Sequence, residues 1–438
     1  MIATLEPMPI ETSAGNYFIS NYPPYSTWTP DDMPHLFQAL SRPAPPSPLG
    51  LYVHIPFCRQ RCTYCSFRAY PLRTKGDVDL YLEALLKELD LYRGYPAVHG
   101  RPLTTVYFGG GSPSFLEGDQ VRRLFSGLQE RTDWSGVEEC TVECEPGTVT
   151  PEKLKAFRES GATRLSIGFQ TLDDDLLRRA GRDTVVGDCL RAFHQARAAG
   201  FMEINVDLLA GLPGETEKSW RRTVDRVLDL QPDCVTVYQF ELTFNSHLYG
   251  SLKAGRNVLL PSWPAKRHWV DLAFRQCEEA GYEVCSGYMA IRHPQWWRFV
   301  HTVDLFWHGH DLLALGESAF GHLQGVHYQN TDTFDKYLGA LSKDKLPLRR
   351  ARRLTAEERL RREVILSLKT GALDAAHFRK KFGVELLDRF REQFEELSEN
   401  GLLEVAGDTL RLTRQGLLEV DWLLPKFYLP EHVGLSYT

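Results

Sequence analysis

Apolar and polar positions follow a regular order between residues 49 and 242. Short apolar runs of strand length alternate with segments in which apolar residues recur at helical spacing. The apolar runs cover 49–55, 104–108, 137–144, 163–170, 203–209 and 233–242. Successive strand–helix units predict a parallel sheet with right-handed crossovers. Because these units are too few to close an eight-stranded barrel, we expect an α/β fold built as a partial (β/α)6 barrel.

The pattern changes on both sides of this region. Residues 1–48 are rich in Pro and aromatic residues ("NYPPYSTWTP", "RPAPPSPLG"), and we expect a leader that packs on the core. The core spans 49–345, and its last part, about 245–345, is less regular and dense in Trp and His. Residues 346–438 form a separate module, in which helical segments precede the strand-like runs "LLEVAG" and "TLRLT". This order is typical of a winged helix. Its helices mix acids with bases, so packing or a lid role is favoured over DNA binding.

Composition excludes several classes of protein. The chain has 438 residues, 43% of them hydrophobic and 25% charged, with a net charge of −6. This balance is that of a globular protein and does not recruit nucleic acid or an anionic membrane. No apolar run has the length of a membrane span, and the first residues do not form a signal peptide. We therefore expect a monomeric, cytoplasmic protein without a membrane span or a nucleic-acid partner.

Cysteines are clustered at one place only. Of the 9 cysteines, Cys58, Cys62 and Cys65 lie together in "CRQRCTYC", directly after the first predicted strand. The others are scattered singly or lie on a strand, and we expect them to be core residues. Thiolates at this spacing bind zinc or an iron–sulfur cluster. A zinc site needs a fourth ligand, and His54, on the strand upstream, points away from the loop. A [4Fe-4S] cluster held by three thiolates would keep one iron open to another ligand.

The cysteine motif, C-x3-C-x-aromatic-C after a first strand, resembles that of the radical S-adenosylmethionine (SAM) superfamily. The stretches "YVHIPFC", "FGGGSPS", "VECEPGTVT", "SIGFQTLDDDLLRRAGR" and "INVDLLAGLPGET", in this order, resemble the family of oxygen-independent coproporphyrinogen III oxidase. The resemblance runs from about residue 18 to 425 and implies a radical SAM barrel with a HemN-type C-terminal domain. It also implies a [4Fe-4S] cluster whose open iron chelates SAM. An electron from a reductant such as flavodoxin or ferredoxin would cleave SAM to methionine and a 5′-deoxyadenosyl radical.

The resemblance assigns residues to the SAM on the cluster. Glycine-rich "FGGGS" follows the second strand, where exposed N–H groups can meet a carboxylate, although a plain βα turn would look the same. Glu143 is an inward-facing carboxylate that could pair with a nearby base, and in the family it holds the methionine amino group. Tyr52 is expected beside the cluster, and the backbone of Tyr64 beside the adenine. The predicted set for this SAM is Tyr52, Tyr64, Gly110, Gly111, Ser112 and Glu143.

Another set of residues comes from the fourth and fifth strands and the turn between them. Gln170, Arg182, Asp207 and Leu209 can converge at one end of a barrel. From the residues alone, a buried hydrogen-bonded network explains them equally well. They resemble the residues that hold a second SAM in this family, where Arg182 would grip a carboxylate and Asp207 an ammonium group.

Departures from the family pattern bear on the reaction. The oxidases resemble C-x3-C-x2-C-x-C, and here Phe67 takes the place of the last cysteine. Heme chaperones of the family carry His-Asn-x-x-Tyr-Trp, where this chain has "TVDLFW" with His301 out of register. With these two departures, the sequence resembles most the class C methyltransferase branch of the family, in which a SAM-methylene radical methylates or cyclopropanates an sp2 carbon. Coproporphyrinogen III oxidation and non-catalytic heme binding are the alternatives.

The stretch 306–330 carries several histidines in what we expect to be a loop-rich region. A histidine of near-neutral pKa would suit removal of a proton from a methylene adduct, and His322 and His327 are the candidates. For each of them a structural hydrogen bond is the more common role. Trp and Tyr residues of 245–345, with the N-terminal "NYPPYSTW", are expected to wall a planar, apolar small-molecule substrate.

Overall fold

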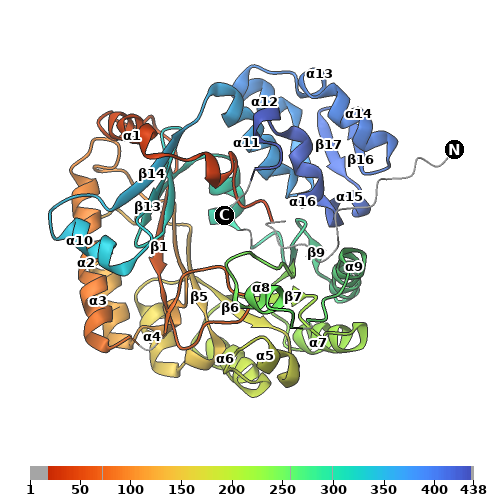
Figure 1. Cartoon of the computed structure of the whole chain (residues 1–438), viewed down its shortest axis with the longest axis horizontal. Helices are drawn as coiled ribbons and strands as arrows, with labels where there is room; N and C mark the ends of the chain where they lie inside the picture. The colour runs from red at the N-terminus through yellow and green to blue at the C-terminus, as the bar shows by residue number, and fades with distance from the viewer. Residues whose placement is uncertain (1–17, 72, 257, 298, 436–438) are drawn as a thin grey trace.

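The central sheet of the computed structural model has 12 strands (Figure 1). The structure describes residues 18–71, 73–256, 258–297 and 299–435. Strands lie in the order β14-β13-β12-β11-β1-β4-β5-β6-β7-β8-β10-β9. The parallel centre consists of the predicted strands: β1 (Leu49–Ile55), β4 (Thr105–Gly110), β5 (Glu139–Cys144), β6 (Arg164–Gln170), β7 (Glu203–Ala210) and β8 (Cys234–Gln239). Within the described ranges β14 and β9 do not pair with each other, so the barrel is partial, as predicted.

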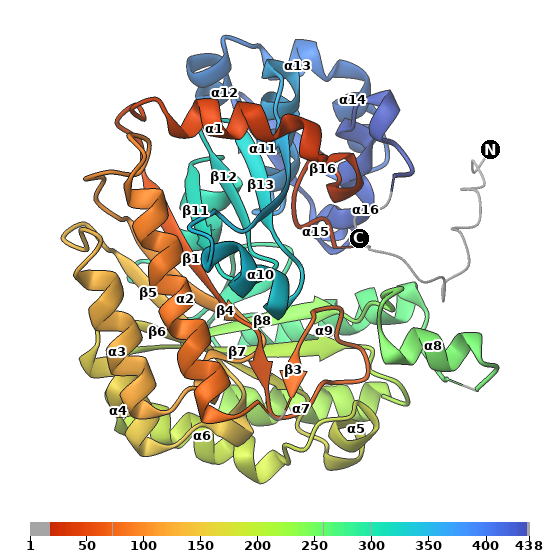
Figure 2. The same ribbon diagram turned by 60° about the vertical axis from the view of Figure 1, so that its left-hand side comes forward.

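Helices connect these strands and cover the outer face of the sheet (Figures 1 and 2). They are α2 (Lys75–Arg93), α3 (Gly118–Gln129), α4 (Pro151–Glu159), α5 (Asp174–Arg179), α6 (Val186–Ala198) and α7 (Glu217–Asp229). Local sequence sets their ends. In α4 the Thr150 side chain accepts a hydrogen bond from the Lys153 N–H, Pro151 occupies the first turn, and Gly161 follows at φ 111°. Such caps explain why the helix boundaries could be predicted from sequence.

The region after β8 is more ordered than expected. It contains α8 (His247–Lys253), α9 (Trp263–Glu279), β9 (Glu283–Val284), β10 (Met289–Ile291), η5 (Val300–Trp307), β11 (Asp311–Leu315), β12 (Phe320–Leu323), β13 (Val326–Asn330), α10 (Phe334–Leu341) and β14 (Leu348–Arg353). The prediction that 306–330 is loop-rich is wrong, because three of its segments are strands. Their turns use Gly316 (φ 105°) and Gly325 (φ 79°), which break the run into pieces too short to show a period.

The element η5 is a π-helix that covers one end of the barrel. The N–H of Val300 donates to the Glu139 carboxylate (2.8 Å), and the His301 ring bonds Thr105 Oγ1 (2.8 Å). Leu305 packs against Gly50. Gly50 is the second residue of β1, and Thr105 and Glu139 are the first residues of β4 and β5, so η5 closes the N-terminal end of the sheet. π-Helices are rare and are often found at functional sites.

The described N-terminal segment, from residue 18, and the C-terminal module pack together on the side of η5. The N-terminal segment includes η1 (Tyr25–Thr27), η2 (Pro30–Asp32) and α1 (Met33–Leu40), and α1 packs on β13 and β14 (Figure 2). Residues 1–17 of the predicted leader lie outside the described residues. The C-terminal elements are α11 (Ala356–Leu368), β15 (Ala372–Asp374), α12 (Ala375–Phe382), α13 (Leu386–Arg389), α14 (Arg391–Glu399), β16 (Leu403–Ala406), β17 (Thr409–Leu412), α15 (Arg414–Leu418) and α16 (Val420–Leu423). One apolar cluster joins this module to Ile19, Tyr22, Phe299 and Trp307.

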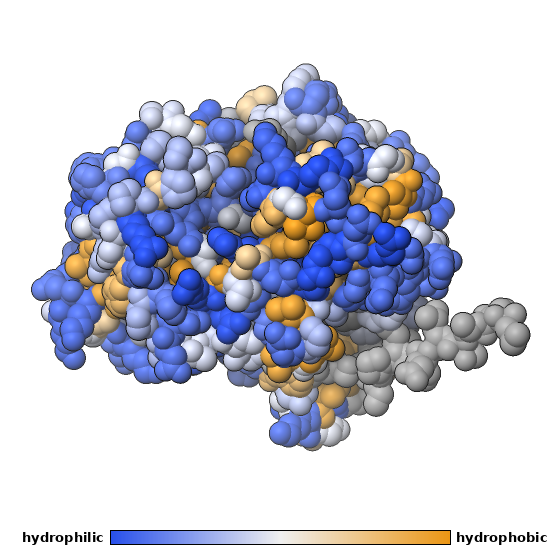
Figure 3. Space-filling model, turned by 90° about the horizontal axis from the view of Figure 1, so that it is seen from above, coloured by the Kyte–Doolittle hydropathy of each residue, from blue (hydrophilic) through white to orange (hydrophobic). Residues whose placement is uncertain are grey.

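The surface and the cysteines agree with the composition. The face seen in Figure 3 is mostly hydrophilic, with smaller hydrophobic areas between the polar side chains. None of the described helices is long and apolar enough to cross a membrane. Cys140, Cys144, Cys189, Cys234 and Cys277 are buried and Cys285 is half-buried, as expected of residues that pack rather than bind metal.

Candidate active site

The three clustered cysteines line a single cavity of about 600 Å³. Cys58 ends the short strand β2 (Phe57–Cys58), and the loop that follows is tied to the barrel by backbone bonds. The Thr63 N–H donates to Ala180 O (2.9 Å) and Thr63 O accepts from the Leu248 N–H (2.8 Å), while within the loop the Cys65 N–H donates to Cys62 O (3.2 Å). Arg61 donates to Cys65 O (3.0 Å). These bonds hold the thiols at the C-terminal end of the parallel strands, where barrel enzymes place their sites.

The donor set fits an iron–sulfur cluster. Burial, with smaller contributions from the neighbouring thiols, raises the pKa of Cys58 to about 12, and burial also raises the pKa of Cys62 and Cys65. Such thiols become thiolates only when cations replace their protons. In the part of the chain that is described, no three His, Cys, Asp or Glu side chains converge on one metal ion. A cluster does not require this, because each thiolate binds a different iron.

His54 does not complete a zinc site with the cysteines. Its ring lies beside Gly110, its Nδ1 is 3.1 Å from the Tyr52 hydroxyl, and it lines a different cavity from the thiols. Burial lowers the pKa of His54 to about 4. Tyr52 also lines that second cavity and not the one lined by the cysteines, and its place beside the cluster stays a prediction.

The glycine-rich turn and Glu143 form one unit on the wall of the cysteine cavity. Gly110, Gly111, Ser112 and Glu143 all line it. Tyr107 donates its hydroxyl to Glu143 (2.7 Å), and the Gly110 N–H donates to the other carboxylate oxygen (3.1 Å). Burial raises the pKa of Glu143 to about 7. This carboxylate is therefore fixed in position and poised to accept a hydrogen bond or a positive charge.

The expectation that N–H groups of this turn are free for a carboxylate is wrong. The Gly111 N–H donates to Ile55 O and the Ser112 N–H to Phe57 O, both at 2.8 Å, while that of Gly110 is used by Glu143. The turn runs alongside the end of β1, whose carbonyls take these donors. What the glycines provide is close approach, since a Cβ at Gly111 would lie 2.8 Å from Phe57 O.

Replacing Gly110 by Ala is expected to destabilise the protein by about 3 kcal/mol. Gly110 has φ 110°, and a Cβ there would lie 2.4 Å from the His54 ring. The matched control is Gly100→Ala, at φ 68° with no heavy atom within 4 Å, where backbone strain alone predicts about 1 kcal/mol. Denaturant unfolding of both variants measures the difference. Equal losses of unfolding free energy in the two variants would mean that the contact with His54 does not contribute to the destabilisation.

The residues assigned to a second SAM line the same cavity as the cysteines. Gln170, Arg182, Asp207 and Leu209 all belong to its wall. Arg182 is already occupied: it pairs with Glu145 (2.6 Å) and donates to Gly168 O (2.8 Å) and to the Tyr64 hydroxyl (3.3 Å). Asp207 accepts from Ser166 and Asn205, each at 2.8 Å. The buried network and the cavity wall are thus made by the same side chains. Asp207 faces the cavity from a fixed position, and Arg182 would have to exchange partners to grip a ligand.

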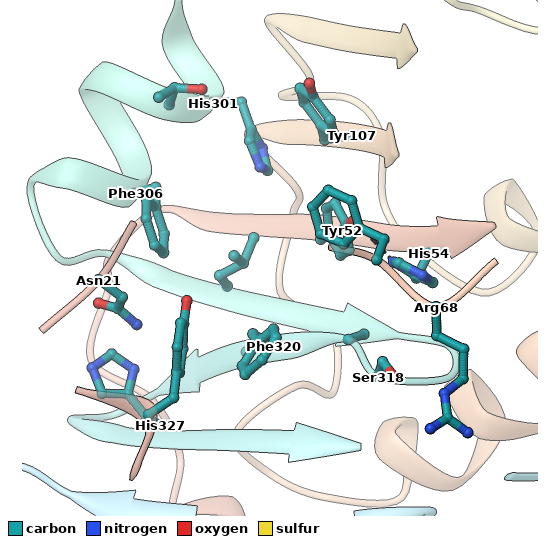
Figure 4. A pocket seen from close by; sticks show the side chains of 16 residues that line it. Asn21, Tyr52, His54, Arg68, Tyr107, His301, Phe306, Ser318, Phe320 and His327 are labelled. Atoms are coloured by element: carbon teal, nitrogen blue, oxygen red, sulfur yellow. Dashed lines mark hydrogen bonds between the residues drawn. The ribbon is translucent and has the colours of Figure 1, made fainter. Parts of the chain in front are cut away.

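A second, smaller cavity of about 270 Å³ adjoins the cysteine cavity (Figure 4). We call it the aromatic cavity. It extends between β1, η5 and the β11–β13 strands, and its wall includes Tyr52, His301, Phe306 and Phe320. Its lining residues are Asn21, Tyr25, Tyr52, His54, Phe67, Arg68, Tyr107, His301, Thr302, Phe306, Leu312, Ser318, Ala319, Phe320, Gly321 and His327. The two cavities share Phe67, Tyr107, Thr302 and Phe306. They therefore meet at the side chain that holds Glu143.

The two candidate histidines stand opposite each other on β12 and β13. Their ring centroids are 4.7 Å apart, and the His327 ring stacks on Trp28 at 4.9 Å. His327 lines the aromatic cavity, whereas His322 does not. Burial lowers the pKa of His322 to about 4 and that of His327 well below 6.5. The expectation of a near-neutral base is therefore wrong for both, because neither ring is solvated.

Sequence reasoning missed several residues of the aromatic cavity. His301, set aside as out of register, packs on Tyr107 with ring centroids 4.8 Å apart. Asn21, Tyr25 and His54 also line the cavity. For Asn21 and Tyr25 the signal was the motif "NYPPYSTW", which suggested that the N-terminal segment lies over the substrate; no signal pointed to His54 or His301 as lining residues. The contacts themselves come from tertiary structure, which no local pattern reports.

Comparisons with known proteins agree with this geometry. Residues 52–227 match the model of the radical SAM superfamily, and residues 354–418 match that of the HemN C-terminal domain. The chain is 31% identical over 373 residues to the heme chaperone HemW of Bacillus subtilis, covering 84% of this chain and 96% of that protein. It is 28% identical over 405 residues to the oxygen-independent coproporphyrinogen III oxidase of Escherichia coli, covering 87% and 85%.

A solved structure extends the likeness to three dimensions. Coproporphyrinogen III oxidase (HemN) from Escherichia coli superimposes with a TM-score of 0.80 at 27% identity, covering 93% of this chain and 96% of that one. These relatives support the fold and the family. They do not support the methyl-transfer chemistry that the loss of the last cysteine suggests.

Proposed function

The chain belongs to the HemN-like family of the radical SAM superfamily, and on that premise we propose that it is an enzyme that cleaves SAM reductively. The substrate of the ensuing radical chemistry is a flat, apolar molecule in the aromatic cavity. A cluster held by Cys58, Cys62 and Cys65, once bound, supplies the electron for this cleavage. The observation that carries the proposal is the junction of the two cavities at Phe67, Tyr107, Thr302 and Phe306.

The protein's own residues have distinct roles in this proposal. Glu143 accepts hydrogen bonds from the amino group of the SAM on the cluster, and Tyr107 and the Gly110 N–H keep the carboxylate in place. Tyr107 also faces the aromatic cavity, so it sets the distance between cofactor and substrate. The rings of Tyr52, Phe306 and Phe320 exclude water from the substrate.

For the reaction we propose methyl or methylene transfer from a second SAM. Two features support it: Phe67 in place of a fourth cysteine, and Asp207 fixed on the cavity wall by Ser166 and Asn205. The aromatic cavity also suits an apolar substrate better than coproporphyrinogen III, which carries several propionates. Among its described lining residues Arg68 is the only Lys or Arg, and burial keeps the His54, His301 and His327 rings uncharged through lowered pKa values.

Coproporphyrinogen III oxidation is the second candidate, and the TM-score of 0.80 to the Escherichia coli enzyme favours it. Heme binding without SAM cleavage is the third, favoured by the 31% identity to the Bacillus subtilis chaperone.

An anaerobic assay with methyl-deuterated SAM separates these candidates without knowledge of the acceptor. Reconstituted protein is incubated with dithionite and the labelled SAM, and the 5′-deoxyadenosine is analysed by mass spectrometry. We expect deuterium in the 5′-deoxyadenosine, because the proposed hydrogen donor is the methyl group of the second SAM. Asp207→Asn should keep cleavage of SAM but lose most of the deuterium, since only the second site changes.

Three results would contradict the proposal. Unlabelled 5′-deoxyadenosine together with CO2 from coproporphyrinogen III would establish the oxidase. Stoichiometric heme uptake without any SAM cleavage would establish a chaperone. Full deuterium transfer in Asp207→Asn would remove that residue from the second SAM site.

A further inference from the structure

One end of the aromatic cavity is polar, and its polarity is set by the amide of Asn21. The side chain is 3% exposed and lines the cavity. Its Oδ1 accepts from Arg362 Nε and from the Tyr22 N–H, both at 2.9 Å. Because both partners are donors, the oxygen must face them and the amide cannot be flipped. The NH2 group is thereby left as the donor that Asn21 can offer to a ligand.

Other groups at the same end complete a small recognition site. Figure 4 places His327 beside Asn21, at the opposite end of the cavity from Arg68. His327 Nε2 is bonded to Tyr22 O (3.3 Å), so this nitrogen carries the hydrogen, and the buried Nδ1 has no hydrogen-bond partner among the described residues. The Tyr25 hydroxyl lies 3.2 Å from Ser20 Oγ, and its ring packs on Phe320 with centroids 4.4 Å apart.

A buried positive charge stands behind Asn21. Arg362 is 2% exposed and donates to Asn21 Oδ1 and to Phe306 O (3.0 Å). Within the described residues no carboxylate lies at ion-pair distance from it, and the neighbouring Glu363 pairs with Lys381 (2.6 Å) and His377 (2.5 Å). Burial lowers the pKa of Arg362 to about 10 and the Glu363 charge opposes this shift, so the guanidinium stays a cation without a direct ion pair. Such a cation polarises the Asn21 amide and favours negative charge or a carbonyl oxygen in front of it.

We propose that this end of the aromatic cavity binds an sp2 oxygen of the substrate, through the Asn21 amide N–H and the Tyr25 hydroxyl. The substrate class is then a flat aromatic molecule with a ring carbonyl or a carboxylate on its edge. Its remaining surface meets apolar walls such as Phe306, Leu312 and Phe320. The volume of about 270 Å³ is near the lower limit of ligand pockets and suits two or three fused rings. This inference rests on the proposed function, in which the aromatic cavity holds the substrate.

Binding of three small probes to the full-length protein tests the inference. Indane, indanone and an indane carboxylate share one ring system and differ only in the oxygen. Ligand-observed NMR gives the dissociation constant of each. We expect indanone or the carboxylate to bind more tightly than indane. Whichever of the two binds more tightly identifies whether the site prefers a carbonyl or a carboxylate oxygen.

Asn21→Asp is the decisive variant. It keeps an acceptor for Arg362 and Tyr22 and replaces the donor in the cavity by an acceptor. The preference for the oxygenated probe over indane should fall about tenfold or more. Asn400→Asp, the same change at an exposed helix end, should leave it unchanged. Tyr25→Phe, which keeps the ring packing, should reduce the preference more modestly, and it serves if Asn21→Asp does not fold.

Equal binding of all three probes to the native protein, or an unchanged preference in both variants, would overturn the inference. These measurements use neither SAM nor cluster. If the probes show no preference but deuterium transfer is observed, the proposed function therefore stands and only this inference fails. If the probes show the preference but no deuterium is transferred, the oxygen site stands and the proposed reaction fails.

Discussion

Alanine at any one of Cys58, Cys62 or Cys65 will abolish reductive cleavage of SAM. Each thiol is needed to hold a separate iron, and the three come from one loop; Cys144, at the end of β5, also lines the cavity but is buried in the sheet. We expect absorbance near 400 nm and about four irons per chain to be lost after anaerobic reconstitution. Formation of 5′-deoxyadenosine should fall below about 1% of the wild-type rate, because the electron has no route to SAM.

Cys285→Ala is the matched control. Cys285 is half-buried and does not line the cysteine cavity, so iron content and 5′-deoxyadenosine formation should equal those of the wild type. Quantification of iron and sulfide, together with product analysis by chromatography, checks both variants. If a single cysteine variant still cleaved SAM at a tenth of the wild-type rate, the assignment of the cluster would be incorrect.

The barrel and the cysteine loop could be predicted because their determinants are local. The strands β1 and β4 to β8 are almost wholly buried, and the helices between them carry their own caps, such as Thr150 before α4. Parallel strands buried on both faces leave few alternatives once the order of elements is known. The cysteines follow β1 directly. Once β1 was predicted as a strand, their position at the C-terminal end of the sheet followed from it.

The substrate side of the site could not be predicted, because it is assembled from distant segments. Asn21 and Arg362 are separated by 341 residues and meet through one hydrogen bond. The strands β11 to β13 are short and divided by glycines, and their histidines are buried by Trp28 and Tyr22 from the other end of the chain. Burial by remote segments also explains the lowered pKa values of those histidines, which composition alone would place near neutrality.

Tyr107 links the two parts of the site. Its hydroxyl holds Glu143 in the cofactor cavity, while its ring faces the aromatic cavity and stacks on Tyr52 with centroids 6.0 Å apart. A change in the substrate cavity can therefore reach the proposed contact between Glu143 and the SAM amino group through a single side chain. We expect Tyr107 to couple substrate binding to the position of SAM, so variants of Glu143 report on both.

Replacing Glu143 by Gln should weaken SAM binding by about 10- to 100-fold and slow cleavage by at least as much. Gln matches the shape of Glu but turns one acceptor into a donor, so one of its two partners, the Tyr107 hydroxyl or the Gly110 N–H, faces another donor. It also removes the negative charge that attracts the amino group. Tyr107→Phe keeps the carboxylate and should cost less. Calorimetry on the reconstituted protein under anaerobic conditions measures both.

The pH dependence of SAM binding shows whether Glu143→Gln weakens binding by removing the negative charge of Glu143 or by disturbing the shape of the site. Burial raises the pKa of Glu143 to about 7, so the free protein holds a proton there below pH 7 that must leave when SAM's amino group binds. Affinity due to this carboxylate is thus present above pH 7 and falls by up to about tenfold per unit below it. The SAM amino group titrates near 8 and adds its own pH dependence in both proteins. Between pH 6 and pH 8 the wild-type affinity should therefore rise more steeply than that of Glu143→Gln, by up to about tenfold. Parallel curves would show that Glu143 stays ionised throughout this range or does not contact SAM. Equal affinities of the wild type and Glu143→Gln at pH 8 would establish the second and remove Glu143 from the proposed role.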